Sequence, residues 1–126
     1  MIKLLAVAVG GGLGACSRYL IAAYADKFVC SAFPWATLAA NLTGSLLMGV
    51  FWGCFEKIHI SNEFRLFLFT GFLGGFTTFS TFARESVQLF KTGEILTAII
   101  YITASNLLAV LLVGAGFMLS GRVFRF

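Results

Sequence analysis

A run of glycine, hydroxyl and phenyl side chains at residues 74–82 is the part of this chain best suited to chemistry. It reads Gly-Gly-Phe-Thr-Thr-Phe-Ser-Thr-Phe and lies inside a hydrophobic segment long enough to cross a bilayer. In hydrocarbon, backbone that leaves a helix must be buried in protein or line a water-filled or ion-filled cavity, because each N–H and C=O needs a partner. The run therefore predicts a transport protein, with a helix break at Gly74–Gly75 and a second half-helix from about Thr78.

The same run offers ligands for ions of either sign. Carbonyls released at a break coordinate cations, whereas the N-terminus of a half-helix directs N–H groups towards anions. Rings and hydroxyls alternate here as Phe76, Thr77, Phe79, Ser80, Thr81 and Phe82. Phenyl edges are weakly positive and hydroxyls donate hydrogen bonds, so such a strip suits a small anion that passes several weak sites. The alternative is that phenylalanines at helical spacing are core or lipid-facing residues.

Membrane-spanning helices must position this strip. The chain has 126 residues, of which 60% are hydrophobic and 11% charged, so it cannot bury its apolar surface in water. A helix crosses the hydrocarbon core with roughly 20 apolar residues, and suitable windows occupy residues 4–25, 35–55, 64–90 and 95–119. We expect an all-α integral membrane protein in which residues 1–126 form one four-helix transmembrane domain.

Polar side chains inside these windows are costly, and each marks a site or a helix contact. Arg18 could snorkel to the interface or attract anions into a vestibule. Asn41 lies too deep to snorkel, so its amide joins helices or hydrogen-bonds a permeating species. Glu85 follows Arg84 near the end of its window, where a charge pair at the water boundary is ordinary.

Several other classes of function lack support in the sequence. The three cysteines, at positions 16, 30 and 54, form no CxxC pair and have no histidine at ligand spacing, which excludes a zinc site. No ATP-binding motif or catalytic constellation is present, so we expect no enzyme. The net charge of +4 lies mostly in connectors near lipid headgroups, without the basic run that nucleic acid would require.

The charges of the connectors bear on topology. Four spans place both termini on one side, and that side carries more Lys and Arg than the other. The set on the terminal side is Lys3, Lys57, Arg65, Arg122 and Arg125, and the set on the far side is Lys27 and Lys91, with Arg84 as a third if it is counted. This modest excess favours cytoplasmic termini.

Residues 70–82 resemble the signature of a known family, the small bacterial fluoride channels called Fluc or CrcB. Residues 10–15 with Arg18, and residues 34–42, resemble the first and second helices of that family in order and spacing. The resemblance implies an antiparallel, dual-topology homodimer in the bacterial inner membrane. It also implies two pores that export cytoplasmic fluoride passively and one structural sodium ion on the two-fold axis.

The resemblance assigns roles to individual residues. Phe79 and Phe82 would form an aromatic box whose edges contact fluoride, and Asn41 would hydrogen-bond the ion. Arg18 would lie near the vestibule and Glu85 at the end of the third helix. The polar side of the pathway would comprise Ser80, Thr81, Tyr101 and Ser105.

The sodium site and the departures from the family pattern complete these expectations. Backbone carbonyls of Gly74 and Thr77, two from each subunit, would hold the sodium. Ala83 and Ala109 stand where family members often carry small hydroxyl residues, so the polar track would be thinner here. Arg84 adds an unusual charge at the pore end.

The sequence is also consistent with other functions and with another topology. A structural or accessory membrane subunit would use its polar residues only for helix association and would carry no flux. A small dual-topology exporter of organic cations would need a carboxylate deep in the bilayer, whereas Glu85 lies near the end of its span. The uneven connector charges also leave room for a fixed topology with a separate partner subunit.

Overall fold

The computed structural model describes residues 1–29 and 31–123, so Cys30 and Arg125 lie outside the described residues. The elements in order are α1 (Ile2–Phe28), α2 (Trp35–Lys57), α3 (Asn62–Arg65), the π-helix η1 (Leu66–Leu73), α4 (Gly74–Phe76), α5 (Phe79–Lys91) and α6 (Ile95–Val123). Four stretches are long and apolar enough to cross a membrane, namely α1, α2, Asn62–Lys91 and α6. The expected all-α fold with four spans is confirmed.

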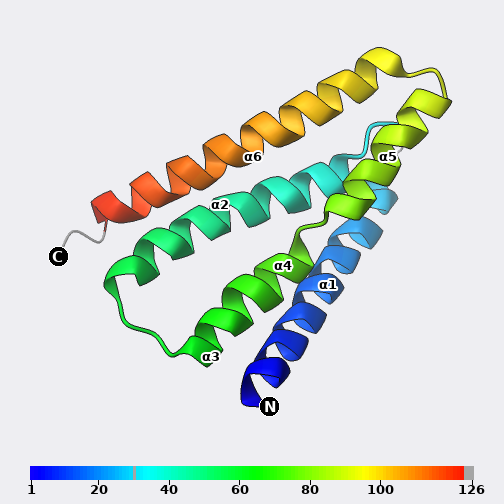
Figure 1. The fold of residues 1–126 in the computed structure, drawn as a ribbon. Helices are drawn as coiled ribbons and strands as arrows, with labels where there is room; N and C mark the ends of the chain where they lie inside the picture. Colours follow the sequence, from blue (N-terminus) through cyan, green and yellow to red (C-terminus); the bar gives the residue numbers. More distant parts are fainter. Residues whose placement is uncertain (30, 124–126) are drawn as a thin grey trace.

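The helices form two pairs that the third span connects (Figure 1). One pair is α2 with α6, and the other is α1 with η1 and α4. Beyond α4 the chain turns away from α1, and α5 packs against α6 and α2. The two halves of the third span therefore belong to different pairs, and the break in this span is the crossing point.

Glycines set the close spacing within each pair. In the first pair, a Cβ at Gly49 would collide with the Val113 carbonyl. In the second pair, a Cβ at Gly14 would collide with the Phe72 carbonyl. Without a hydrophobic driving force in lipid, this close backbone approach supplies the van der Waals contact that holds helices together.

Gly14→Ala is expected to destabilise the protein because its methyl group has no room beside the Phe72 carbonyl. Overpacking costs about 1–3 kcal/mol, against a gain of about 1 kcal/mol in helix propensity. Gly12→Ala is the matched control, since a Cβ there meets nothing within 4 Å. Thermal unfolding in detergent should show a lower midpoint for Gly14→Ala and an equal or higher one for Gly12→Ala; equal midpoints would contradict the packing argument.

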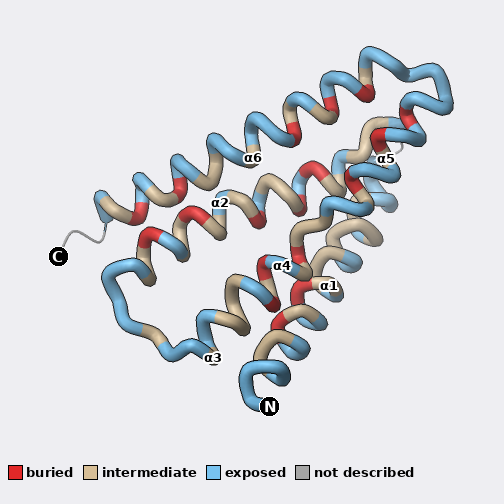
Figure 2. Tube along the Cα trace, viewed as in Figure 1, coloured by how far each residue is buried: buried red, intermediate tan, exposed pale blue. Residues whose placement is uncertain are grey.

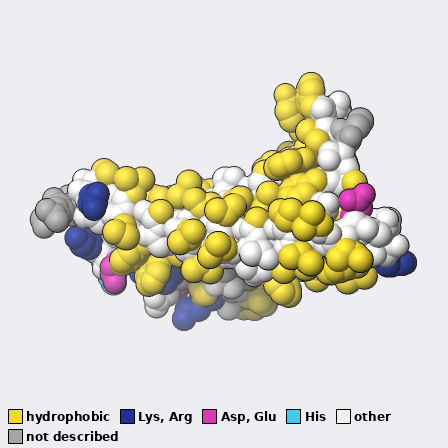
Figure 3. All heavy atoms as spheres, turned by 90° about the horizontal axis from the view of Figure 1, so that it is seen from above, with side chains coloured by type: hydrophobic (Ala, Val, Ile, Leu, Met, Phe, Trp, Pro, Cys, Tyr) yellow, Lys and Arg dark blue, Asp and Glu magenta, His cyan; other side chains and the backbone are white. Residues whose placement is uncertain are grey.

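The outer faces of the helices are apolar, and the charges gather at the two ends of the molecule (Figures 2 and 3). Buried residues lie mainly on the facing sides of the helices, whereas large side chains on the outer sides are exposed. Examples include Leu4, Tyr19, Leu96 and Val110, each more than half exposed. Lys, Arg, Asp and Glu lie beyond the hydrophobic middle in the view of Figure 3. This distribution is that of a multi-pass membrane protein.

Candidate functional site

The third span breaks at Thr77–Thr78, and the expected break at Gly74–Gly75 was misplaced. Gly74 is helical, with φ −64° and ψ −36°, and the Thr77 N–H still donates to the Leu73 carbonyl at 3.0 Å. Extended backbone follows, with ψ 153° at Thr77 and ψ 123° at Thr78. The second half-helix begins at Phe79, close to the position expected from the sequence.

Of the two glycines, Gly75 is required for helix packing and Gly74 is not. A Cβ at Gly75 would lie 2.5 Å from the Gly11 carbonyl, so glycine is required for α4 to approach α1. A Cβ at Gly74 would meet only the Phe69 carbonyl, at 3.7 Å, which is ordinary contact. Gly75 therefore marks a close helix contact, and the break itself lies at Thr77–Thr78.

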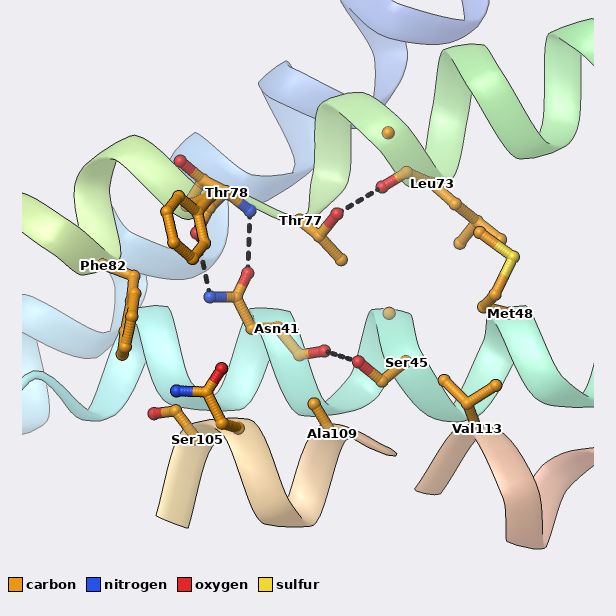
Figure 4. Close-up of a pocket in the computed structure, with 14 residues that line it drawn as sticks. Asn41, Ser45, Met48, Leu73, Thr77, Thr78, Phe82, Ser105, Ala109 and Val113 are labelled. Atoms are coloured by element: carbon orange, nitrogen blue, oxygen red, sulfur yellow. Dashed lines mark hydrogen bonds between the residues drawn. The ribbon is translucent and has the colours of Figure 1, made fainter. Parts of the chain in front are cut away.

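Asn41 holds the break through both ends of its amide (Figure 4). Its Nδ2 donates to the Thr78 carbonyl at 3.0 Å, and its Oδ1 accepts the Thr78 N–H at 2.8 Å. Ser45, one turn later on α2, donates to the Asn41 carbonyl at 2.8 Å. Of the two roles expected for Asn41, helix joining is thus observed directly. An amide nitrogen carries two hydrogens, so Nδ2 keeps a second donor for another partner.

A groove of about 290 Å³ opens beside the break, between α2, α6 and both halves of the third span. Six of the residues expected at the site line it: Asn41, Gly74, Thr77, Phe79, Phe82 and Ser105. Ala109, one of the departures from the family pattern, lines it as well, together with Ser45, Thr78 and Asn106. The groove therefore combines phenyl rings, amides and hydroxyls and contains no ionised side chain.

The two rings of the groove differ in exposure. Phe79 is 76% exposed and Phe82 is 8% exposed, with ring centroids 5.6 Å apart. Phe82 also packs on the Tyr101 ring, at a centroid distance of 5.1 Å. Phe76 does not join them, because it precedes the break and is buried against Phe72 in a stacked pair. Phe76, Phe79 and Phe82 therefore do not share one face, because helical periodicity does not continue across the extended backbone at Thr77–Thr78.

Two buried hydroxyls beside Phe82 lack hydrogen-bond partners among residues 1–29 and 31–123. They are Tyr101 Oη and Ser105 Oγ, one turn apart on α6. The Tyr101 ring is fully buried, and the Phe33 ring meets it edge-on at a centroid distance of 5.4 Å. An unsatisfied buried polar group costs about 1–3 kcal/mol. Ser105 lines the groove, where an entering anion or water would use an unpaired donor, whereas Tyr101 lies outside that lining and contacts Phe82.

A second cavity, of about 360 Å³, lies where the connector between α1 and α2 meets α5. Its polar lining comprises Asp26, Ser31, Thr37, Thr81, Arg84 and Glu85. The Thr37 hydroxyl donates to Glu85 Oε1 at 2.5 Å, which links α2 to α5. Thr81 was expected on the fluoride pathway and Glu85 at the pore end, and both line this second cavity.

Thr37 was missed by the sequence reasoning, although a signal for it exists. Thr37, Asn41 and Ser45 recur every four residues and so form one polar stripe along α2. Tyr101 and Ser105 repeat the pattern on α6. A search for polar residues at helical spacing would have found both stripes.

Three expected residues line neither of these cavities, namely Arg18, Ser80 and Tyr101. Ser80 is exposed. Arg18 is half-buried, and its Nε donates to the Gly75 carbonyl at 3.2 Å, beside the break. The vestibule role of Arg18 stays a prediction, and its contact with backbone is an addition from the structure.

Comparison with known proteins by family model and by individual relatives points to one family. A family model described as "CrcB-like protein, Camphor Resistance (CrcB)" matches residues 5–117. A protein of Desulfotalea psychrophila named "Fluoride-specific ion channel FluC" is 50% identical over 97% of this chain and 94% of its own length. Proteins with the same name from Rhizobium etli and Flavobacterium psychrophilum are 47% and 41% identical, over 92% and 90% of this chain and 94% and 93% of their own lengths.

Proposed function

The chain belongs to the CrcB family, and from this membership we propose that it is a fluoride-selective ion channel that exports cytoplasmic fluoride passively. The names of its relatives support this function over nearly the whole chain. The observation that carries it in this molecule is the groove, which is lined by two phenyl rings and the unpaired Ser105 hydroxyl and by no ionised side chain among the described residues. An interior-negative potential drives an anion outwards by about 2.3 kcal/mol per 100 mV.

The groove suits fluoride because it offers several weak contacts, one after another along the path of the ion. The edges of Phe79 and Phe82 attract an anion without the full charge that would trap it. The second hydrogen of Asn41 Nδ2 and the hydroxyls of Tyr101 and Ser105 replace part of the hydration shell. Towards the second cavity, the path passes Phe82 and continues among Thr37, Thr81 and Glu85.

A second copy of the chain would complete the pathway. Phe79 and Ser80 are exposed at the depth of the break, where a hydroxyl facing lipid is unfavourable. Covering these residues with an antiparallel partner would close the groove and give two equivalent pores in one homodimer. Dual insertion in the inner membrane would require that the uneven connector charges not dictate a single orientation.

Sodium at the centre of that dimer fits the chemistry of the break. Hard cations of this kind prefer oxygen ligands, and half-helix breaks supply them as carbonyls. Gly74 and Thr77 both line the groove at the point where helical hydrogen bonding stops. Two such carbonyls from each subunit would hold the ion, whose charge would fix the two breaks against each other.

Fluoride efflux from liposomes that contain the purified protein tests the channel proposal. We expect rapid release to an ion-selective electrode once a potassium ionophore removes the opposing potential, with little chloride release in parallel. Protein-free liposomes give the background. Absence of release from folded protein would support an accessory subunit, and equal chloride release would contradict selectivity.

Arg84 is expected to assist anion entry at the second cavity. It is exposed at a mouth that also contains the carboxylates of Asp26 and Glu85, so it offsets their repulsion of an anion. Arg84→Gln should lower fluoride efflux about twofold or more in 10 mM salt, where the Debye length is about 30 Å. Efflux should approach the wild-type rate in 1 M salt, where that length is about 3 Å.

The matched control for Arg84 is Lys91→Gln, which removes an equal charge from the end of the same helix outside both cavities. The control should retain wild-type efflux at both salt concentrations. A salt-independent loss in Arg84→Gln would contradict an electrostatic role for this residue.

A further inference from the structure

We propose that the side chains of Asn41 and Thr78 free the carbonyls of Gly74 and Thr77 for the sodium ion, while Arg18 occupies the Gly75 carbonyl between them. All three would be positioning residues, acting on backbone that in turn contacts the ion. The inference rests on the proposed sodium site and explains why the carbonyls of Gly74 and Thr77, and not that of Gly75, are available.

Asn41 frees the Gly74 carbonyl. In an α-helix the N–H of a residue donates to the carbonyl four positions earlier, so Thr78 would serve Gly74. The Thr78 N–H instead donates to Asn41 Oδ1 at 2.8 Å. The Thr78 carbonyl is held at the same time by Asn41 Nδ2 at 3.0 Å, which keeps this peptide from turning back into the helix.

Thr78 frees the Thr77 carbonyl in the same way, because a side-chain oxygen accepts the N–H that a continuous helix would direct to that carbonyl. The donor that a continuous helix would supply to Thr77 is the Thr81 N–H. Thr78 Oγ1 accepts that N–H at 3.3 Å as the N-cap of α5. A second bond, from Thr78 Oγ1 to Thr81 Oγ1 at 3.1 Å, fixes the hydroxyl in place.

Arg18 binds the Gly75 carbonyl, which lies between those of Gly74 and Thr77 in the sequence. Gly75 would be served by the N–H of Phe79, which lies beyond the break. The Arg18 Nε donates to the Gly75 carbonyl at 3.2 Å, on the side where α4 packs closely against Gly11 of α1. A charge-assisted hydrogen bond is stronger than a neutral one, so the Gly75 carbonyl is withheld from a cation while the carbonyls of Gly74 and Thr77 remain available.

Thr78→Val tests the exchange, because valine keeps the shape of threonine and loses the hydroxyl. Without Oγ1, the Thr81 N–H is free to return to the Thr77 carbonyl and competes with the ion. We expect the sodium concentration that half-maximally raises the thermal unfolding midpoint, titrated against N-methylglucamine, to increase about tenfold or more. Thr78→Ser retains Oγ1 and should keep the wild-type value.

Ser61→Ala separates this effect from ordinary loss of a helix cap. Ser61 Oγ caps α3 by accepting the Phe64 N–H at 3.1 Å, far from the break in sequence and on an exposed connector. Its removal should lower the unfolding midpoint equally at every sodium concentration. A uniform loss in Thr78→Val, or a sodium shift in Thr78→Ser, would overturn the inference.

A replacement variant and two further outcomes test the sodium site separately from the channel function. Thr78→Ala removes the same hydroxyl with less bulk and replaces Thr78→Val if the latter is not recovered folded; an unshifted sodium response in it would equally overturn the inference. A wild-type protein that shows fluoride efflux but no sodium response would reject the sodium site and leave the channel standing. A sodium response without efflux would reject the channel function and leave the carbonyl arrangement standing.

Discussion

Phe82→Ile is expected to remove most fluoride efflux while leaving the protein folded. Phe82 is 8% exposed at the inner wall of the groove, and its ring lies between those of Phe79 and Tyr101. Isoleucine fills much of the volume but has no positive ring edge, so the anion loses an attractive contact where it has shed water. We expect efflux to fall about 100-fold or more, which corresponds to a barrier increase of about 2.7 kcal/mol.

Phe90→Ile provides the control for this prediction. Phe90 lies on the same helix, is 43% exposed and lines neither cavity. Its replacement should leave efflux near the wild-type rate, and size-exclusion profiles should be unchanged in both variants. Wild-type efflux from folded Phe82→Ile would show that the ring edge of Phe82 is not needed for fluoride permeation. Loss of folding in Phe82→Ile would indicate a packing role.

Much of the architecture was predictable because membrane spans are specified locally. Long apolar windows predicted four spans, and the described residues contain four apolar helical stretches long enough to cross a membrane, the third of them broken. The half-helix from about Thr78 was predictable as well, since a threonine before a helical segment is a common N-cap. The composition of the groove followed from the same short run, because Thr77, Phe79 and Phe82 are neighbours in sequence.

The position of the break was not predictable from local sequence. Glycine permits both a break and a close helix contact, and only the tertiary partner decides between them. Gly75 faces Gly11 on α1, and the amide that ends the helix comes from Asn41 on α2. Arg18 illustrates the same limit, since its Gly75 partner lies 57 residues away in the sequence.

The Thr37–Glu85 bond bears on the rival interpretations of the polar residues. An exporter of organic cations would need a carboxylate that is free to exchange a proton and a substrate deep in the membrane. Glu85 instead accepts a hydrogen bond from Thr37 at a cavity that also contains the Arg84 cation. That environment favours an anion pathway beside a fixed carboxylate.

Tyr101→Phe is expected to lower fluoride efflux and, unusually for a core substitution, to raise stability. The Tyr101 hydroxyl is buried without a hydrogen-bond partner in the described part of the chain, and its ring packs against those of Phe33 and Phe82. Removal of an unsatisfied buried hydroxyl with retention of the ring should stabilise the protein by about 1–3 kcal/mol. Efflux should fall about tenfold because a donor to the permeating anion is lost.

The opposite signs of these two effects distinguish a pathway residue from a core residue. A tyrosine that served only packing would gain stability as phenylalanine with no change in efflux, and one that bonded an internal partner would lose stability. Tyr19→Phe, on the 70% exposed side chain of α1, should change neither property. A protein stabilised by Tyr101→Phe but slower in efflux would therefore assign the unpaired hydroxyl to the fluoride pathway, since the energetic cost of leaving it unpaired is offset only when an ion or water enters.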